Sequence, residues 1–353
     1  MTPGIYYSHP ACLQHDPRVH SPGHPDVPER LIALEAALQA RDWMGWERRR
    51  APAAREQQLE LVHAPEHVAA IRDLCLSGGG AIDADTFVGI ASFEAALHAC
   101  GGAIAMAKDL MTGTAPVGFC GVRPSGHHAG RASSMGFCLF DNVAVAAAWA
   151  LAEGGAERVF ILDWDVHAGN GTEEIFRERS DVLFACIHQQ GLFPGTGPLR
   201  DAGFGEGEGY TINLPVPPGS GEGLWLALLE DVVLPAAGAF APDLVLISAG
   251  FDAHAADPLA DCALQTGSFA KMAGLAREAA AAAGAPLGAV LEGGYNRQVL
   301  AESVCATLPA LAGEDGAEES HTNPGGQGRR VLSAGEAALL ERAREQVARR
   351  WPV

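Results

Sequence analysis

The 353-residue sequence lacks the short motifs that mark several common protein classes. No G-x-S-x-G or Walker-type sequence occurs, which removes the common serine-hydrolase and NTPase interpretations. The eight cysteines are scattered and form no C-x-x-C pair, so neither a zinc ribbon nor a thioredoxin-like motif is present. The first residues, MTPGIYYSHP, have neither the basic nor the apolar segment of a signal peptide. We therefore expect a reducing, cytoplasmic location.

Positive charge is also scarce, with 24 Lys and Arg residues against 43 Asp and Glu residues and a formal net charge of -19. Non-specific nucleic-acid binding needs Lys and Arg to neutralise phosphates, so we expect no nucleic-acid partner. No uninterrupted apolar run is long enough to cross a bilayer, and we expect no membrane partner. The acidic balance favours cationic partners, and a homo-oligomer is compatible with the sequence.

Hydrophobic residues, by contrast, make up 48% of the chain, enough for a sizeable buried core. Short β-branched and aromatic runs alternate with longer Ala/Leu/Glu-rich segments. Several of the short runs are apolar throughout, which is typical of strands covered on both faces. The predicted strands are Gly4–Ser8, Pro116–Cys120, Val159–Asp165, Val182–His188, Tyr210–Val216, Leu244–Asp252 and Gly288–Gly294. The predicted helices are Pro28–Arg41, Glu56–Ser77, Ser92–Met111, Asn142–Glu153, Gly223–Phe240, Ser268–Ala283 and Ala334–Arg350.

This alternation predicts an α/β fold in which helices cover both faces of a mostly parallel sheet. No Pro-, Gly- or Ser-rich linker divides the chain before residue 313, so we predict a single domain over residues 1–353. The polar, turn-rich segment 313–330 is predicted to be an exposed loop before the last helix.

Polar residues gather where the predicted strands end. Asp163, Asp165 and His167 lie at the end of one strand, and His127-His128 follows another. Asp252 and Tyr295 lie at the ends of two more. Ligands of an open parallel sheet bind outside the carboxyl ends of its strands, so these side chains are predicted to share one site.

Asp165 and His167 are two residues apart on a predicted extended strand end, so their side chains point to the same side. A carboxylate oxygen and an imidazole nitrogen could then bind one ion together. With Asp252 as third ligand, one position stays open for water and substrate, as in catalytic zinc sites. Ordinary hydrogen bonding at a loop start would explain one such residue, but it does not explain the whole set.

The remaining candidates suit hydrolysis beside that ion. A histidine of the pair His127-His128 could take a proton from the attacking water and deliver it to the leaving amine. Asp163 could hold and polarise one of these imidazoles. The hydroxyl of Tyr295 could donate a hydrogen bond to a developing oxyanion, although a packing role is the alternative for this residue alone.

At these motifs the chain resembles the histone deacetylase superfamily, particularly bacterial proteins similar to class II deacetylases. The resemblance runs from His24 to Tyr295, and it is carried by HPDVPERL, RPSGHHA, GFCLFDN, DWDVHAGNGT, FPGTG, SAGFDAH and EGGYN in the family's order. It implies an arginase/deacetylase α/β fold with a central parallel sheet of about eight strands.

The resemblance also implies a role for each matching residue. It assigns Zn²⁺ to Asp165, His167 and Asp252. It makes His128 the general base and acid, His127 the neighbouring imidazole paired with Asp163, and Tyr295 the residue that polarises the acetyl carbonyl. The positions implied for the substrate tunnel are Gly136, Phe137 and Phe193 in its walls and Leu259 at its rim. Structural K⁺ ions are implied near Asp163, Asp165 and His167.

The sequence departs from the family pattern at several positions. Ala168 replaces a second histidine that is not a zinc ligand, so we expect altered packing rather than lost metal. Cys186 stands where a serine commonly offers its hydroxyl to the inner K⁺, and a thiol is a poor ligand for that ion. We therefore expect the inner K⁺ site to be weakened or empty. Ser125 replaces a proline with little expected effect, and Asn170 gives His128 a neutral partner.

Three functions fit the resemblance. The first is a zinc-dependent deacetylase that hydrolyses the acetyl amide of acetyl-lysine in proteins, peptides or small molecules. The second is an acetylpolyamine amidohydrolase, but Leu259 favours the first because an acidic residue at that rim would suit a distant ammonium group. The third is a non-catalytic protein that binds acylated ligands, which the intact zinc ligands, histidine pair and tyrosine argue against.

Overall fold

The computed structural model describes residues 2–314 and 332–353. Eight strands, all paired in parallel, form its central sheet in the order β2-β1-β5-β10-β9-β6-β7-β8. This sheet confirms the predicted fold class. The predicted loop at 313–330 lies outside the described residues, apart from Gly313 and Glu314.

The sheet strands are β1 (Ile5–Ser8), β2 (Glu47–Arg50), β5 (Val117–Cys120), β6 (Val159–Asp163), β7 (Val182–Gln189), β8 (Thr211–Val216), β9 (Leu244–Ala249) and β10 (Leu287–Leu291). Strands β5, β6, β7, β9 and β10 are buried throughout, as expected for strands covered on both faces. A separate antiparallel pair, β3 (Gly80–Ala81) and β4 (Phe87–Val88), lies outside this sheet.

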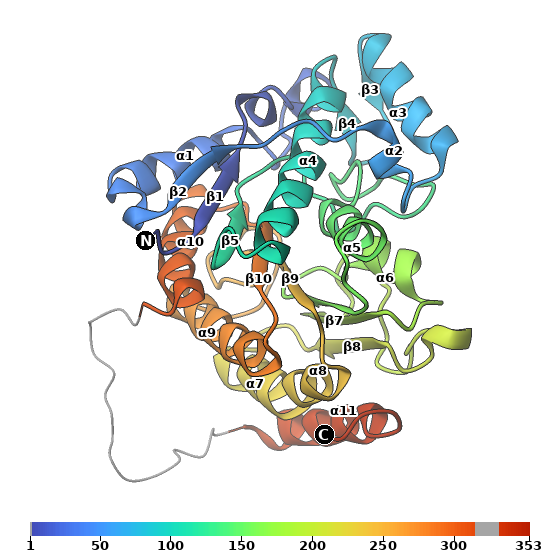
Figure 1. Cartoon of the computed structure of the whole chain (residues 1–353), viewed down its shortest axis with the longest axis vertical. Coiled ribbons are helices and arrows are strands. Elements are labelled where there is room, and N and C mark those ends of the chain that lie inside the picture. The colour runs from blue at the N-terminus through green and yellow to red at the C-terminus, as the bar shows by residue number, and fades with distance from the viewer. Residues whose placement is uncertain (1, 315–331) are drawn as a thin grey trace.

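Helices cover both faces of the sheet (Figure 1). On one face α4 contacts β1, β5 and β10, and α5 contacts β6 and β9. On the other face α9 packs against α10 and α8, and α1 packs against α10. The helices are α1 (Glu29–Gln39), α2 (Glu56–Leu59), α3 (Pro65–Leu76), α4 (Ser92–Met111), α5 (Asn142–Ala152), α6 (Asn170–Phe176), α7 (Glu222–Leu228), α8 (Leu234–Phe240), α9 (Thr266–Ala283), α10 (Arg297–Ala312) and α11 (Ala334–Val347).

Some predicted boundaries are wrong. The helix predicted over Glu56–Ser77 is two helices, because Pro65 lacks an amide hydrogen and takes the first turn of α3. Strands β6, β9 and β10 end at Asp163, Ala249 and Leu291, before the polar residues that were predicted to lie on them. The candidate ligands Asp165, His167 and Asp252 therefore belong to loops that follow the strands.

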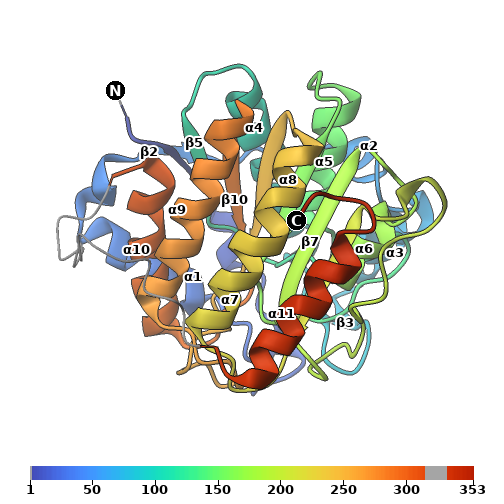
Figure 2. The ribbon, with the colours of Figure 1, turned by 90° about the horizontal axis from the view of Figure 1, so that it is seen from below.

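The segment Glu222–Phe240 is long and apolar enough, by length and composition, to cross a membrane. It consists of α7, a π-helical turn at Leu229–Val233 and α8. In the fold 61% of this segment is buried, as in a core helix. It packs against α9, and α11 lies across it near the chain end (Figure 2).

Candidate metal centre and active site

Three candidate ligands from two loops converge at the carboxyl edge of the sheet. Asp165 and His167 follow β6, Asp252 follows β9, and one ligand atom from each lies within 4.8 Å of the others. The Nδ1 atom of His167 lies 3.0 Å from Oδ1 of Asp165 and 3.3 Å from Oδ2 of Asp252. Both aspartates are fully buried.

Asp165 and His167 lie in a turn after β6, and not on the extended strand end that was predicted. The main-chain N–H of Asp165 donates to Asp163 Oδ1 at 3.0 Å, and that of His167 donates to Asp165 Oδ1 at 2.9 Å. Aspartate side chains that accept from the backbone two residues later turn the chain. The loop after β6 therefore presents both side chains from a tight turn.

Glycines leave the space that these carboxylates occupy. A Cβ atom on Gly250 would lie 2.1 Å from Asp165 Oδ2, and one on Gly293 would lie 1.9 Å from Asp252 Oδ2. Main-chain donors hold both carboxylates: Gly293 N–H donates to Asp165 Oδ2 at 2.8 Å, and Val166 N–H donates to Asp252 Oδ1 at 2.9 Å.

The donor set fits a small divalent cation. Asp252 Oδ2 is buried and accepts no hydrogen bond from the described residues, and His167 Nδ1, 3.3 Å away, donates no hydrogen when it is the unprotonated, metal-binding nitrogen. An unsatisfied buried carboxylate oxygen is costly, and a cation would neutralise it. Two carboxylates and one imidazole are ligands that Zn²⁺ takes, and three protein ligands are typical of its catalytic sites.

The predicted histidine pair lies beside this cluster. The ring centroids of His127 and His128 are 4.0 Å apart, and those of His128 and His167 are 5.8 Å apart. His127 Nδ1 lies 3.0 Å from Asp163 Oδ2, as predicted, and His128 Nδ1 lies 2.7 Å from Asn170 Oδ1. Because the amide oxygen only accepts, Nδ1 of His128 carries the hydrogen and Nε2 is left as the basic nitrogen.

The two imidazoles differ in charge. Burial lowers the pKa of His127, but the carboxylates of Asp163 and Asp165 outweigh it and hold that pKa well above its ordinary value. Burial lowers the pKa of His128 well below its ordinary value, and the imidazoles of His127 and His167 lower it further. His128 is therefore the neutral imidazole of the pair.

Tyr295 follows β10 and is held through its backbone. Its N–H donates to Asp257 Oδ2 at 2.6 Å, and the same carboxylate accepts from Leu259 N–H at 3.0 Å. The guanidinium of Arg30 lies over the tyrosine ring, 4.8 Å from its centroid. Burial raises the pKa of Tyr295 well above its ordinary value, so the hydroxyl remains a hydrogen-bond donor at neutral pH.

Phe137 and Phe193, the predicted tunnel residues, each contact a residue of the site. Phe193 lies 5.2 Å from His128 with their rings at 89°, and Phe137 lies 5.7 Å from Tyr295 with their rings at 83° (centroid distances). Phe137 has a φ of 69°, which a bulky residue rarely adopts. Gly136 is needed before it, because a Cβ there would lie 2.4 Å from the ring of His128.

The sequence that builds this site is similar to those of known proteins. A model of the histone deacetylase domain matches residues 24–311, most of the chain. The chain belongs to the histone deacetylase family. Family members with similar sequences include a histone deacetylase-like amidohydrolase of Pseudomonas aeruginosa, 38% identical over 82% of this chain and 77% of that protein. A probable deacetylase of Archaeoglobus fulgidus is 38% identical over 89% of this chain and 88% of that protein.

The fold also agrees with the family. The crystal structure of the HDA15 HD domain superposes with a TM-score of 0.89 at 34% sequence identity, covering 99% of this chain and 95% of that one. The chloroplastic histone deacetylase 14 of Arabidopsis thaliana is 41% identical over 68% of this chain. This chain spans a little over half the length of that protein, 58%.

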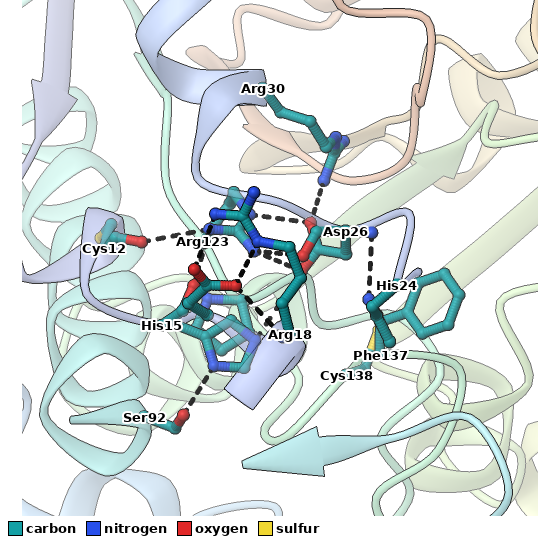
Figure 3. A network of polar contacts seen from close by, with 12 residues as sticks. Cys12, His15, Arg18, His24, Asp26, Arg30, Ser92, Arg123, Phe137 and Cys138 are labelled. Atoms are coloured by element: carbon teal, nitrogen blue, oxygen red, sulfur yellow. Dashed lines mark hydrogen bonds and ion pairs between the residues drawn. The ribbon is translucent and has the colours of Figure 1, made fainter. Parts of the chain in front are cut away.

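Sequence reasoning assigned no role to a buried charged network that supports the family site (Figure 3). Asp26 accepts from Arg30 Nη1 at 2.7 Å and from Arg123 Nε and Nη2 at 2.7 Å each. Arg30 also donates to the carbonyls of Glu292 and Gly294, next to Tyr295. Asp26 and Arg30 lie in HPDVPERL and Arg123 in RPSGHHA, so the charged residues of these two motifs were the signal that could have revealed the network.

Glu292 is a second supporting residue without a predicted role. Its Oε2 accepts from the N–H groups of Gly126 at 2.7 Å and His127 at 3.3 Å. The carboxyl group is fully buried, and this burial raises its pKa to about 8. Glu292 thereby fixes the backbone from which the histidine pair projects.

Proposed function

We propose that this histone deacetylase-family chain hydrolyses the acetyl amide of acetyl-lysine, in a protein, peptide or small molecule, to a free amine and acetate. The observation that carries the proposal is the convergence of Asp165, His167 and Asp252 within 4.8 Å beside the neutral imidazole of His128. The names of the Pseudomonas and Archaeoglobus relatives, an amidohydrolase and a probable deacetylase, support the reaction class.

Zn²⁺ would be held by Asp165, His167 and Asp252, where it would act as a Lewis acid on the acetyl carbonyl and activate water. The protein groups carry the protons. Nε2 of His128, whose other nitrogen is fixed by Asn170, takes the proton from the attacking water and gives it to the leaving nitrogen. His127, held by Asp163, supplies positive charge next to the developing oxyanion.

Tyr295 belongs to the loop after β10 and adds a hydroxyl group to the site. Its hydroxyl would donate a hydrogen bond to the carbonyl oxygen as negative charge builds there. Phe137 and Phe193 would enclose the alkyl chain that carries the amide, and Gly136 would let it pass close to the backbone. Leu259 lies in the same loop as Asp257, whose carboxylate holds the backbone of Tyr295, so a rim role for Leu259 suits this arrangement.

A second candidate substrate is an acetylated polyamine. The relative named polyamine deacetylase HDAC10 of Homo sapiens is 38% identical over 81% of this chain, which covers 44% of that protein. The net charge of -19 would attract a cationic substrate. The apolar side chain of Leu259 still favours acetyl-lysine, because it offers no charge to a distant ammonium group.

K⁺ binding is proposed to be weak at the inner site. Cys186 is fully buried, and its thiol lies 3.9 Å from the carbonyl oxygen of His167. Alkali cations prefer oxygen ligands, and a thiol supplies a soft, weakly coordinating atom instead. The carbonyl and carboxylate oxygens of this loop would remain available to K⁺.

Turnover of a substrate panel tests the proposed reaction. Acetyl-lysine peptides, acetylpolyamines and longer acyl amides should be assayed with and without a chelator. We expect acetyl-lysine peptides to be hydrolysed fastest, and we expect the chelator to abolish turnover until Zn²⁺ is returned. Turnover that the chelator leaves intact would refute the metal-dependent reaction, and a preference for acetylpolyamines would support the second candidate.

A further inference from the structure

A second cavity lies away from the metal centre, between α11 and the segment 190–200 that follows β7. Its volume is about 590 Å³, within the range of small-molecule sites. Its apolar lining includes Leu199 and Pro215, which are partly exposed, and the buried residues Leu214, Leu228 and Leu339. The cavity therefore has apolar side chains in its lining and lies beside the C-terminal helix α11.

The polar lining of this cavity carries positive charge only. Arg200 and Arg342 line it, and no Asp or Glu does, although the chain has a net charge of -19. Both arginines are exposed, and neither guanidinium makes an ion pair or hydrogen bond with residues 2–314 or 332–353. Two guanidinium groups free of acidic partners are suited to binding a carboxylate in fork geometry.

The cavity also reaches the segment that carries Phe193. Gly191 and Gly195 line it, and the tunnel residue Phe193 lies between them in sequence. Gly195 and Gly197 both have positive φ values, 81° and 73°, so the backbone turns sharply just after Phe193. A molecule bound in the cavity would contact the loop that positions Phe193 against His128.

We propose that this cavity is a binding site for an amphiphilic carboxylate, a linear alkyl acid. Arg200 and Arg342 would bind the carboxylate, and the partly exposed apolar lining at Leu199 and Pro215 would take the alkyl chain. The site is separate from the metal centre, so its occupancy does not depend on the proposed hydrolysis. Acetate alone lacks the chain that this lining requires.

Calorimetric titration of the purified full-length chain with octanoate tests the site. We expect saturable binding of one octanoate per chain, weakened at least about ten-fold in Arg342→Gln because a charge-assisted hydrogen bond is lost. Arg344→Gln is the matched control, since Arg344 is an exposed arginine of α11 that does not line the cavity. The control should bind like the parent, and thermal unfolding should show both variants folded.

Ligand series test the two halves of the proposed ligand separately. Affinity should rise about three- to four-fold per methylene from hexanoate to octanoate, as apolar burial predicts. Octylamine, with the opposite charge, should not bind. The proposal is overturned if octanoate shows no saturable binding, if Arg342→Gln binds as well as Arg344→Gln, or if affinity is independent of chain length.

Discussion

His128 and Tyr295 approach the proposed reaction from two loops, and each depends on a fixed partner. Asn170 holds Nδ1 of His128 at 2.7 Å, and Asp257 holds the backbone of Tyr295 at 2.6 Å. Both contacts are made between protein groups. The protein thus positions its proton carrier and its oxyanion donor in advance, which lowers the reorganisation needed during reaction.

Removing either group should slow turnover without unfolding the chain. We expect His128→Ala to reduce turnover by about 10² to 10⁴-fold, since a positioned acid–base group contributes that much. Tyr295→Phe should cost about 10² to 10³-fold, as for other oxyanion donors. Steady-state assays with measured metal content check both values. Near-normal activity in either folded variant would refute the role proposed for that residue.

Cys186 offers a test of the K⁺ proposal. Cys186→Ser replaces a soft sulfur with a hydroxyl oxygen beside the carbonyl of His167. We expect this variant to gain more thermal stability from KCl over NaCl than the parent does, because bound ions stabilise the folded state. Cys75→Ser, at another buried cysteine on α3, is the control. Equal salt responses in the parent and both variants would count against the proposed role of Cys186.

The residues that carry chemistry were predictable because polar side chains interrupt the sequence where apolar strands end. Asp26, Asp257 and Glu292 were not assigned roles, because they act on the backbone or on other charges far away in sequence. Glu292, for example, accepts from Gly126, 166 residues earlier. No local pattern shows which distant N–H group a buried carboxylate will meet.

At the scale of elements, one histidine joins three segments around the histidine-pair loop. His63 lies between α2 and α3, and its Nδ1 lies 2.9 Å from the carbonyl of Gly130. The N–H of Asp141, just before α5, donates to His63 Nε2 at 2.9 Å. Nε2 must therefore stay unprotonated, and burial lowers the pKa of His63 to about 4.

This arrangement predicts acid sensitivity. The unfolded chain protonates His63 near its ordinary pKa of about 6.5, whereas the folded chain resists protonation until about 4. Stability is therefore lost as the pH falls below about 6.5, by about 2 kcal/mol from this group between pH 7 and pH 5. Denaturant unfolding at both pH values should show a smaller loss in His63→Gln than in the parent. The exposed His20→Gln is the control, and an unchanged loss in His63→Gln would contradict the assignment.

Elements with clear apolar patterns were predicted, and those without them were missed. Strand β2 reads ERRR and is largely exposed at the edge of the sheet, so no buried face marks it. Helix α10 contains Pro309, which argues against a helix in sequence. Helix α6 spans only Asn170–Phe176 and begins inside the DWDVHAGNGT motif, where polar residues obscure its pattern.

At the scale of the whole molecule, the sheet order brings the site together. Strand β10 lies between β5 and β9, so the loops carrying His127-His128, Tyr295 and Asp252 become neighbours. Strand β6 follows β9 and adds Asp165 and His167. Alternating strands and helices predicted a parallel sheet, but its strand order depends on packing between segments far apart in sequence. The resemblance to the family, rather than periodicity, supplied the expected number of strands.

A cation at the centre of this sheet should stabilise the entire fold. Asp165 and Asp252 are buried next to each other, and a bound cation would relieve their repulsion. Because an ion that binds only the folded state shifts the unfolding equilibrium, we expect chelation to lower the thermal midpoint and Zn²⁺ to restore it. Asp252→Asn should show a much smaller chelator effect in scanning calorimetry. A parent midpoint that is insensitive to chelation would contradict this expectation.

The most direct test of the central claim is an anomalous diffraction measurement at the zinc absorption edge, on crystals of the chain grown with Zn²⁺. The account predicts one strong peak bonded to Asp165, His167 and Asp252, at about 2.0–2.2 Å from their oxygen and nitrogen atoms. A map with no peak among these three side chains, or with its only zinc peak elsewhere, would contradict it.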